Sequence, residues 1–321
     1  MHLAQTQRKK LIITDKIEKS LYSVDLESIT YDVDKVDAVK IDIAAFESDL
    51  EDMRNTWASS CNGLLCFNLG KYLWLYNPST TERKQVPDFH FGKNIKLGFG
   101  YADSIDEYKF VRLRRKIIDV YSLRKNSWTS IQHDLRFRYI IHNRWGFTLN
   151  GAIHWGIYNI EFESILAFDL VKEEFKTLPL PSVPEHDYNP FSLGVFGGYL
   201  CTSKAEGRDR FQFWIMKEYG VKASWTRILT VNPFNIFSYL QPLCYLKDIN
   251  IVMLYKYTEF HIPEYEGLVF HNQEYQKLKK IEVNGIQRLD LACPYVESLV
   301  SPNYENHFAT EGNQLIFPHV I

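Results

Sequence analysis

The chain has 321 residues, 45% of them hydrophobic and 15% aromatic, and its 37 Lys and Arg nearly balance 39 Asp and Glu. This hydrophobic content is enough for a large buried core, whereas a general nucleic-acid or anionic-membrane binder would carry a basic excess. No stretch approaches the roughly 20 apolar residues that span a membrane, and the first residues lack the apolar core of a secretory signal. We therefore expect no nucleic-acid and no membrane partner.

The five cysteines are widely spaced in apolar surroundings: Cys61, Cys66, Cys201, Cys244 and Cys293. A disulfide framework or a zinc site would show closer, paired spacing, so these side chains are better interpreted as buried, reduced thiols. Together with the composition, this predicts a soluble intracellular protein located in the cytoplasm, the nucleus or both.

A short pattern recurs along the chain: an apolar run, often with Tyr or Phe, then a polar turn, then an aromatic or basic residue that leads to Leu, Val or Pro. Its copies cover residues 20–33, 73–87, 117–131, 165–179, 213–228 and 267–281. Equivalent positions, which we call anchors, are Val24, Tyr76, Tyr121, Phe168, Met216 and Phe270, at intervals of 52, 45, 47, 48 and 54 residues. A period of about 50 residues is typical of one four-stranded, kelch-like propeller blade.

A second pair of predicted strands precedes most copies. Residues 61–70, 147–157 and 193–203 each carry Asn-Gly or Gly-Gly between two apolar runs, and such pairs supply the positive φ of tight hairpin turns. Residues 98–113 turn at Asp103 to Asp106, and residues 242–255 turn at Lys247 and Asp248. Each unit therefore consists of strand, turn, strand, loop, strand, turn and strand.

These units predict an all-β fold, a β-propeller of six blades. Its last blade is expected to close by pairing residues 291–302 with the N-terminal strands of residues 11–33, because an open ring would expose sheet edges. Residues 44–57 form either a short helix or a loop. We expect a propeller domain over residues 1–302 and a C-terminal tail over residues 303–321.

In a propeller, the loops between second and third strands and the crossovers between blades open on one face, opposite the hairpin turns. Binding residues concentrate on such loops, and Tyr, Trp and Arg dominate binding hot spots. Alternatively, aromatic loops fold back onto the core. The candidate target-binding residues are Arg136, Phe137, Arg138, Tyr139, His186, Tyr188, Phe234, Phe237, Tyr257, Phe260 and His261.

A basic cluster at residues 111–116 could add attraction for an acidic partner, although a solvated turn explains it as well. Carboxylate pairs such as Glu173 and Glu174 fall in predicted turns, where solvation is the default. His154 falls in a predicted strand, which favours a packed, hydrogen-bonded histidine over a metal ligand. No HExxH, CxxC, GxSxG or GxxxxGK[ST] motif occurs, so we predict neither catalysis nor a metal or cofactor.

The segment FWIMKEYGVKASWTRI, residues 213–228, carries a charged insert between two apolar halves. Met216 and Trp225 are separated by two more residues than the equivalent pairs, Tyr121 with Trp128 and Phe168 with Phe175. This spacing predicts an enlarged hairpin turn, with a positive φ at Gly220 and solvated charges at Lys217 and Glu218. Trp225 is expected in the core.

The motifs SCNGLLCF, LYNPSTTERKQVP, DVYSLRKNSW, FWIMKEYGVKASW and YVESLVSP occur in this order. Over roughly residues 20–302 the chain resembles the F-box-associated interaction domain of plant F-box/kelch and S-locus F-box proteins. The resemblance implies that an N-terminal F-box docks on the Skp-type adaptor of a cullin-RING ubiquitin ligase, while this domain selects the target protein.

The leucine-rich opening of an F-box does not occur in this sequence, so binding of adaptor and cullin is expected only if an F-box is supplied. Two functions follow. The first is the substrate-recognition module of an SCF-type ubiquitin ligase. The second is a free-standing propeller that acts as a binding or decoy protein.

Overall fold

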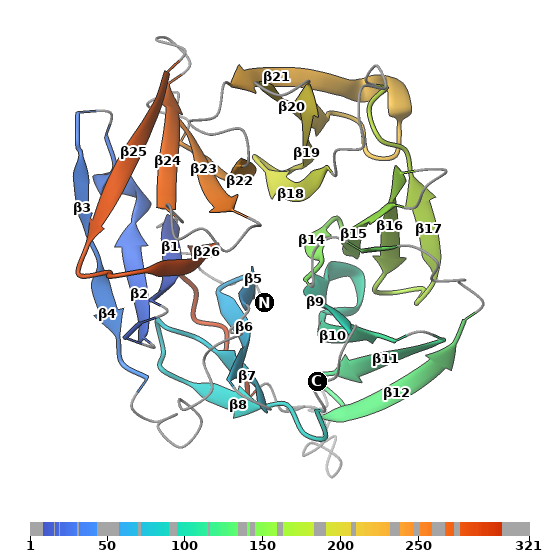
Figure 1. Ribbon diagram of the computed structural model, residues 1–321. Coiled ribbons are helices and arrows are strands. Elements are labelled where there is room, and N and C mark those ends of the chain that lie inside the picture. The colour runs from blue at the N-terminus through green and yellow to red at the C-terminus, as the bar shows by residue number, and fades with distance from the viewer. Residues whose placement is uncertain are drawn as a thin grey trace, which may run out of the picture.

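In the computed structural model of the protein, six sheets surround a central axis (Figure 1). The predicted six-bladed β-propeller is therefore confirmed. The structure describes residues 9–15, 17–18, 20–30, 32–43, 58–69, 72–89, 95–114, 116–133, 140–141, 145–158, 163–182, 191–206, 210–231, 238–246, 251–258, 267–272 and 277–303.

We number the blades 1 to 6 in chain order and give their strands from the axis outward. Blade 1 contains β26 (Leu289–Val296), β1 (Lys9–Asp15), β2 (Ser20–Asp25) and β4 (Val39–Ile41). Blade 2 contains β5 (Ala58–Cys61), β6 (Leu64–Leu69), β7 (Tyr72–Tyr76) and β8 (Arg83–Gln85). Blade 3 contains β9 (Lys96–Ala102), β10 (Glu107–Leu113), β11 (Ile117–Ser122) and β12 (Ser127–Gln132).

Blades 4 to 6 follow the same plan with two additions, a divided inner strand in blade 4 and a fifth strand in blade 6. Blade 4 contains the divided inner strand, β13 (Ile140–Ile141) and β14 (Phe147–Leu149), then β15 (Ala152–Tyr158), β16 (Glu163–Asp169) and β17 (Phe175–Leu178). Blade 5 contains β18 (Ser192–Phe196), β19 (Tyr199–Glu206), β20 (Arg210–Met216) and β21 (Trp225–Val231). Blade 6 contains β22 (Ser238–Leu246), β23 (Ile251–Thr258), β24 (Gly267–Asn272), β25 (Lys277–Asn284) and the fifth strand, β3 (Lys35–Asp37).

All six anchors lie on the third strand of their blades, namely β2, β7, β11, β16, β20 and β24. The residues used to predict the hairpin spacings are cross-strand partners: Tyr121 pairs with Trp128, and Met216 pairs with Trp225. Gly220 has φ +84° and the Trp225 side chain is only 8% exposed, as predicted. The enlarged insert is thus a hairpin turn of blade 5.

The predicted tight turns are present at the Asn-Gly and Gly-Gly pairs. Asn62 and Gly63 have φ values of 49° and 81°, and Asn150 and Gly151 have 51° and 67°. Both residues of such a turn need positive φ, which Asn and Gly adopt at the lowest cost. The Gly197–Gly198 turn of blade 5 follows the same rule.

The residue after the anchor caps the following turn in four blades. The side chains of Asp25, Asn77, Ser122 and Asp169 accept hydrogen bonds from backbone N–H groups two or three residues ahead, at 2.8–3.0 Å. Short polar side chains stabilise turns in this way. This repeated cap explains why the third strand ends at the same place in these blades.

Hydrophobic side chains fill the space between neighbouring blades. Trp155 of blade 4 is fully buried against blade 3, where its indole N–H donates to the Leu97 carbonyl at 3.0 Å. A Cβ on Gly98 would lie 3.0 Å from the Trp155 ring, and one on Gly146 would lie 2.7 Å from it. These glycines therefore allow the indole to pack against the backbone of the inner strand.

The ring is closed as predicted, because β1 pairs antiparallel with β26 from the opposite end of the chain. A second closure was not predicted. Between β2 and β4 the chain leaves blade 1, and β3 adds to the outer edge of blade 6, parallel to β25. We call this the outer latch; its polar contacts join Asp34 to Lys279, Lys35 to Glu282 and Asp37 to Asn284.

Two expectations were wrong, and three fall outside the described residues. Residues 111–113 of the basic cluster belong to β10, where Arg112 is buried and pairs with Asp119, so this part is neither a solvated turn nor a free basic patch. Glu173 is not merely solvated, since it accepts a hydrogen bond from Lys109 of blade 3 at 2.7 Å. Three predicted features lie outside the described part of the chain: the possible helix at residues 44–57, the turn at residues 247–248 and residues 304–321 of the C-terminal tail.

Candidate functional site

The propeller has two faces of different construction. Turns between first and second strands, and between third and fourth strands, lie on the turn face. It includes residues 62–63, 77–82, 103–106, 123–126, 150–151, 170–174, 197–198 and 217–224. Loops between second and third strands, and the crossovers between blades, belong to the loop face. The predicted target-binding residues flank or occupy loop-face connections.

Of these predicted residues, Tyr257 lies near the end of β23, where its backbone pairs with that of Tyr239. Its side chain is not among those the structure describes. Ten others lie outside the described residues: Arg136, Phe137, Arg138, Tyr139, His186, Tyr188, Phe234, Phe237, Phe260 and His261. Their role in binding stays a prediction.

The described part of the loop face holds a fixed polar network around Asp15, at the end of β1. One oxygen of this buried carboxylate accepts the backbone N–H groups of Ile17 and Glu18 at 2.8 and 3.1 Å. The other accepts the N–H of Gln287 at 2.6 Å, in the crossover from blade 6. Ile17, whose backbone N–H belongs to this network, is 58% exposed. The sequence pattern did not predict this arrangement.

Glu18 extends this network along the same loop. It accepts hydrogen bonds from Tyr22 and Gln287 and lies 3.7 Å from the Lys40 ammonium. The hydrogen bond to Glu18, together with burial, raises the pKa of Tyr22 to about 12. Tyr22 therefore serves as a hydrogen-bond donor and not as an acid at neutral pH.

A second network supports the β10–β11 loop of blade 3. The buried Asp119 accepts from Arg112 at 2.8 Å, Arg114 at 2.6 Å and Ser130 at 2.7 Å. Burial opposes its ionisation, but these hydrogen bonds outweigh burial and lower the pKa of Asp119. The Arg112 guanidinium also lies 4.7 Å from the Trp128 ring. The network is structural, and Arg114 is the half-exposed member at the loop.

On the turn face, three motifs of the family resemblance meet in one cluster. Asn77 of NPST is fully buried and donates to the carbonyls of Ser298 and Val300 at 2.9 and 2.7 Å. Its amide oxygen accepts from the hydroxyl of Tyr295 at 3.2 Å and from the N–H of Ser79 at 2.8 Å. The YVESLVSP and NPST motifs are therefore joined directly.

The CNGLL motif completes this cluster. The Ser298 hydroxyl donates to the carbonyl of Asn62 at 2.8 Å, and a Cβ on Gly63 would collide with the Ser298 side chain. Only glycine fits here, for reasons of space as well as of φ. We call Asn62, Gly63, Asn77, Tyr295, Ser298 and Val300 the clasp. It fixes the C-terminal end of the propeller across blade 2 and gives these motifs a structural role.

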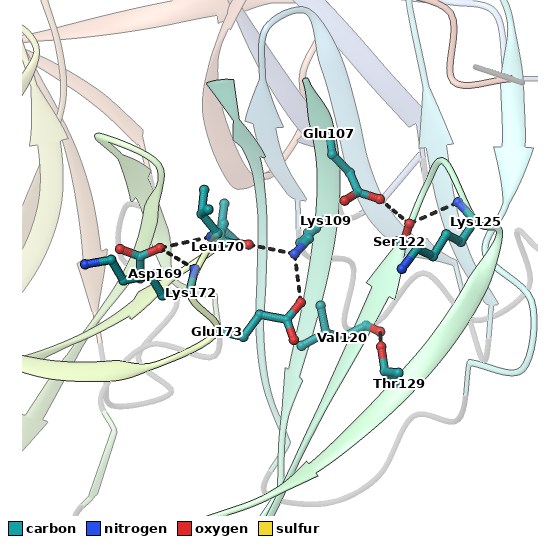
Figure 2. Close-up of polar contacts among 11 residues, drawn as sticks. Glu107, Lys109, Val120, Ser122, Lys125, Thr129, Asp169, Leu170, Lys172 and Glu173 are labelled. Carbon is teal, nitrogen blue, oxygen red and sulfur yellow. Dashed lines mark hydrogen bonds and ion pairs between the residues drawn. The ribbon is translucent and has the colours of Figure 1, made fainter. Parts of the chain in front are cut away.

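Polar contacts of the turn face also join successive blades (Figure 2). The buried Lys109 ammonium of blade 3 donates to the Leu170 carbonyl and to Glu173, both at 2.7 Å, in a turn of blade 4. His154 of blade 4 lies 2.6 Å from the hydroxyl of Tyr219, in the enlarged turn of blade 5. Blade 3 thus holds a turn of blade 4, and blade 4 holds a turn of blade 5.

His154 confirms the prediction of a packed, hydrogen-bonded histidine. It is fully buried, and its Nδ1 lies 3.1 Å from the Phe147 carbonyl, so Nδ1 carries the proton and Nε2 accepts from Tyr219. Burial lowers the pKa of His154 to about 4, which keeps the ring neutral at physiological pH.

Two tryptophans make equivalent contacts at two seams, one between blades 2 and 3 and one between blades 4 and 5. The indole N–H of Trp128 donates to the Pro87 carbonyl at 2.7 Å, and that of Trp225 donates to the Pro179 carbonyl at 2.8 Å. In both cases the proline follows the outer strand of the preceding blade. The recurring Trp and Pro of the sequence pattern are therefore partners across seams.

Nothing in the described ranges assembles a metal centre: no group of three or more His, Cys, Asp or Glu is placed to hold an ion. Burial raises the pKa of the Cys61 thiol to about 12 and that of Cys66 well above its ordinary value, which disfavours the nucleophilic thiolate. No helix among the described residues is long and apolar enough to cross a membrane.

Structural comparison supports the architecture. TolB from Acinetobacter baumannii matches 90% of this chain and 67% of its own with a TM-score of 0.55 at 10% identity. A chain of the nidogen/laminin complex matches 89% of this chain and 98% of its own with a TM-score of 0.50 at 9% identity. At such low identity these likenesses show the fold alone.

Sequence comparison gives relatives from Arabidopsis thaliana. The F-box protein CPR1 is 31% identical over 73% of this chain, and an F-box/kelch-repeat protein, At3g23880, is 28% identical over 76%. The chain spans 64% and 68% of the lengths of these two relatives. Residues 11–302 match the family described as the F-box associated beta propeller domain, and the chain belongs to that family.

Proposed function

We propose that this propeller is the substrate-recognition module of an SCF-type ubiquitin ligase. In this role it binds a target protein through its loop face, performs no chemistry itself and works in the cytoplasm, the nucleus or both. The observation that carries the proposal is membership in the F-box associated family together with similarity to F-box proteins.

The architecture suits this role. The turns and seams on the turn face use buried hydrogen bonds at Asn77, Lys109 and His154, which makes the ring a rigid support. Recognition residues work best when a rigid scaffold orders their connections in advance, because less entropy is then lost on binding. The Asp15 and Asp119 networks extend this support to the loop face.

Affinity capture from plant tissue tests the proposal. The tagged chain is recovered as its full gene product, and the co-purified proteins are identified by mass spectrometry. Recovery of a Skp-type adaptor and a cullin, together with a protein that accumulates when the gene is inactivated, would support ligase function. A stable target without adaptor or cullin would instead indicate the free-standing binding or decoy protein.

A further inference from the structure

The outer latch places an additional strand on a blade that is already complete (Figure 1). Blade 6 has its four strands, β22 to β25, before β3 is added. Blade 1 also has four strands without β3, because β2 pairs directly with β4. The plan of neither blade therefore requires β3. Its position shows that the outer edge of β25 accepts an extended segment, and partner proteins often bind sheet edges by adding a strand in this way.

The contacts of the latch show which chemistry this edge accepts. The Asp34 carboxylate lies 2.8 Å from the Lys279 ammonium, and the Lys35 ammonium lies 2.7 Å from the Glu282 carboxylate. The backbone N–H of Glu282 donates to the Asp34 carbonyl at 3.0 Å. Val36 follows and is buried in the hydrophobic cluster between blades 1 and 6. The edge thus fits an extended segment with an acidic, a basic and a β-branched apolar residue in succession.

Water has access to the contacts that hold the latch. The side chains of Asp34, Lys35 and Glu282 are 80%, 61% and 59% exposed. Exposed ion pairs contribute little to stability, and salt screens them. Of the three residues of β3, Val36 is the one that is buried. A strand held in this way can leave the edge at low cost and be replaced by a segment of the same chemistry.

We propose that the outer edge of β25 is a binding site for an extended segment of a partner protein, and that the outer latch occupies this site while the partner is absent. The partner segment carries the acidic, basic and β-branched pattern of residues 34–36 and adds to blade 6 parallel to β25. The site lies on the outer rim of the ring, apart from the loop face, and does not rest on the proposed ligase function.

The latch competes with the partner, because it belongs to the same chain as the edge. The apparent affinity of a partner segment is then proportional to the fraction of molecules in which the edge is open. Repelling the latch from the edge should therefore tighten binding, without any change in the edge itself.

A synthetic peptide with the sequence of residues 32–40, DVDKVDAVK, serves as the probe. Fluorescence anisotropy measures its binding to the native full chain and to a latch variant that combines Asp34→Lys with Lys35→Glu. These substitutions place like charges opposite Lys279 and Glu282, so they repel the latch and leave the edge unchanged. We expect the peptide to bind the latch variant about tenfold more tightly than the native chain, or tighter still.

The matched control is a peptide of the same composition in which the acidic and basic residues are exchanged, DVKDVDAVK. It should bind the latch variant about tenfold more weakly than the first peptide, because like charges then meet across the edge. An edge variant, Lys279→Glu with Glu282→Lys, opens the latch from the side of blade 6 and should reverse this preference. Thermal unfolding verifies that both variants are folded.

Two results would overturn the proposal: equal binding of the two peptides, or no tighter binding when the latch is repelled by either variant. Analytical ultracentrifugation of the native chain tests a different occupant of the edge. A native chain that sediments as a monomer supports the assignment to a partner. A dimer that dissociates in the latch variant would place the latch of a second copy on this edge and overturn that assignment.

Discussion

The clasp and the outer latch each join an early segment of the chain to a late one, but they are built from different interactions. In the clasp, the fully buried Asn77 exchanges hydrogen bonds with Tyr295 and the Ser298 and Val300 carbonyls. In the outer latch, Lys35 and Glu282 meet at 2.7 Å while both stay largely exposed. Buried polar groups are costly to leave unpaired, whereas exposed ion pairs contribute little, so stability should depend on the clasp.

Buried contacts also stabilise the seams between blades. The largest expected loss of stability follows from removing the Trp225 side chain. Trp225→Ala removes a buried indole and its hydrogen bond to Pro179, and should lower the free energy of unfolding by about 3–5 kcal/mol in urea denaturation. Trp225→Phe is the control, because Phe175 fills the equivalent position of blade 4; it should cost only about 1 kcal/mol. A loss well below 3 kcal/mol for the alanine variant would contradict the core assignment.

Asn77→Ala tests the clasp itself. It leaves the Ser298 and Val300 carbonyls and the Tyr295 hydroxyl without this buried partner, and should cost about 2–4 kcal/mol by equilibrium unfolding. Asn284→Ala, the same substitution at an exposed amide of the outer latch, should change stability by no more than about 0.5 kcal/mol. Equal losses for the two asparagines would show that the clasp contributes no more to stability than the outer latch.

His154 makes a seam sensitive to acid. Its pKa is lowered to about 4 in the fold, so the unfolded chain binds more protons below its ordinary pKa of 6.5, and stability falls as the pH drops from about 6.5 toward 4. His154→Gln lacks this component. The stability difference between the native chain and the variant should therefore shrink by about 3 kcal/mol between pH 7 and pH 4. A difference that does not vary with pH would show that the histidine is not held neutral.

Lys35→Ala in the outer latch should have the smallest effect. The Lys35–Glu282 pair is exposed, so water and salt screen it. We expect the midpoint of thermal unfolding to be unchanged at 150 mM salt. A clear decrease in this midpoint would mean that β3 holds blade 6 in place more strongly than its exposed contacts indicate.

The sequence predicted the blades well because their signals are local. Apolar runs and Asn-Gly pairs act over a few residues, and the spacing from Met216 to Trp225 reproduces the strand register. The clasp could not be predicted in this way, since its Asn77–Ser298 bond joins residues 221 positions apart. The β3 strand was not predicted, because Val36 is the only buried residue among its three and so forms no apolar run.

The candidate site illustrates a different limit. Arg and aromatic residues in loops indicate where binding is expected, but composition carries no information about which side chains converge. Arg112 shows the risk, because it belongs to a basic run in the sequence and yet is buried against Trp128 and Asp119. By contrast, the network at Asp15 depends on a backbone N–H of Gln287, for which no side-chain pattern exists.

We propose that the turn face supports the ring while the loop face binds the target. This division of roles is tested with the predicted binding residues Arg136, Phe137, Arg138 and Tyr139. All four are replaced by alanine, and capture of the target identified in plant tissue is measured beside Val171→Ser, a control on the turn face. We predict that the fourfold variant loses the target while its thermal unfolding midpoint stays close to that of the native chain. Full retention of the target by the fourfold variant, or its loss by the turn-face control, would contradict the account.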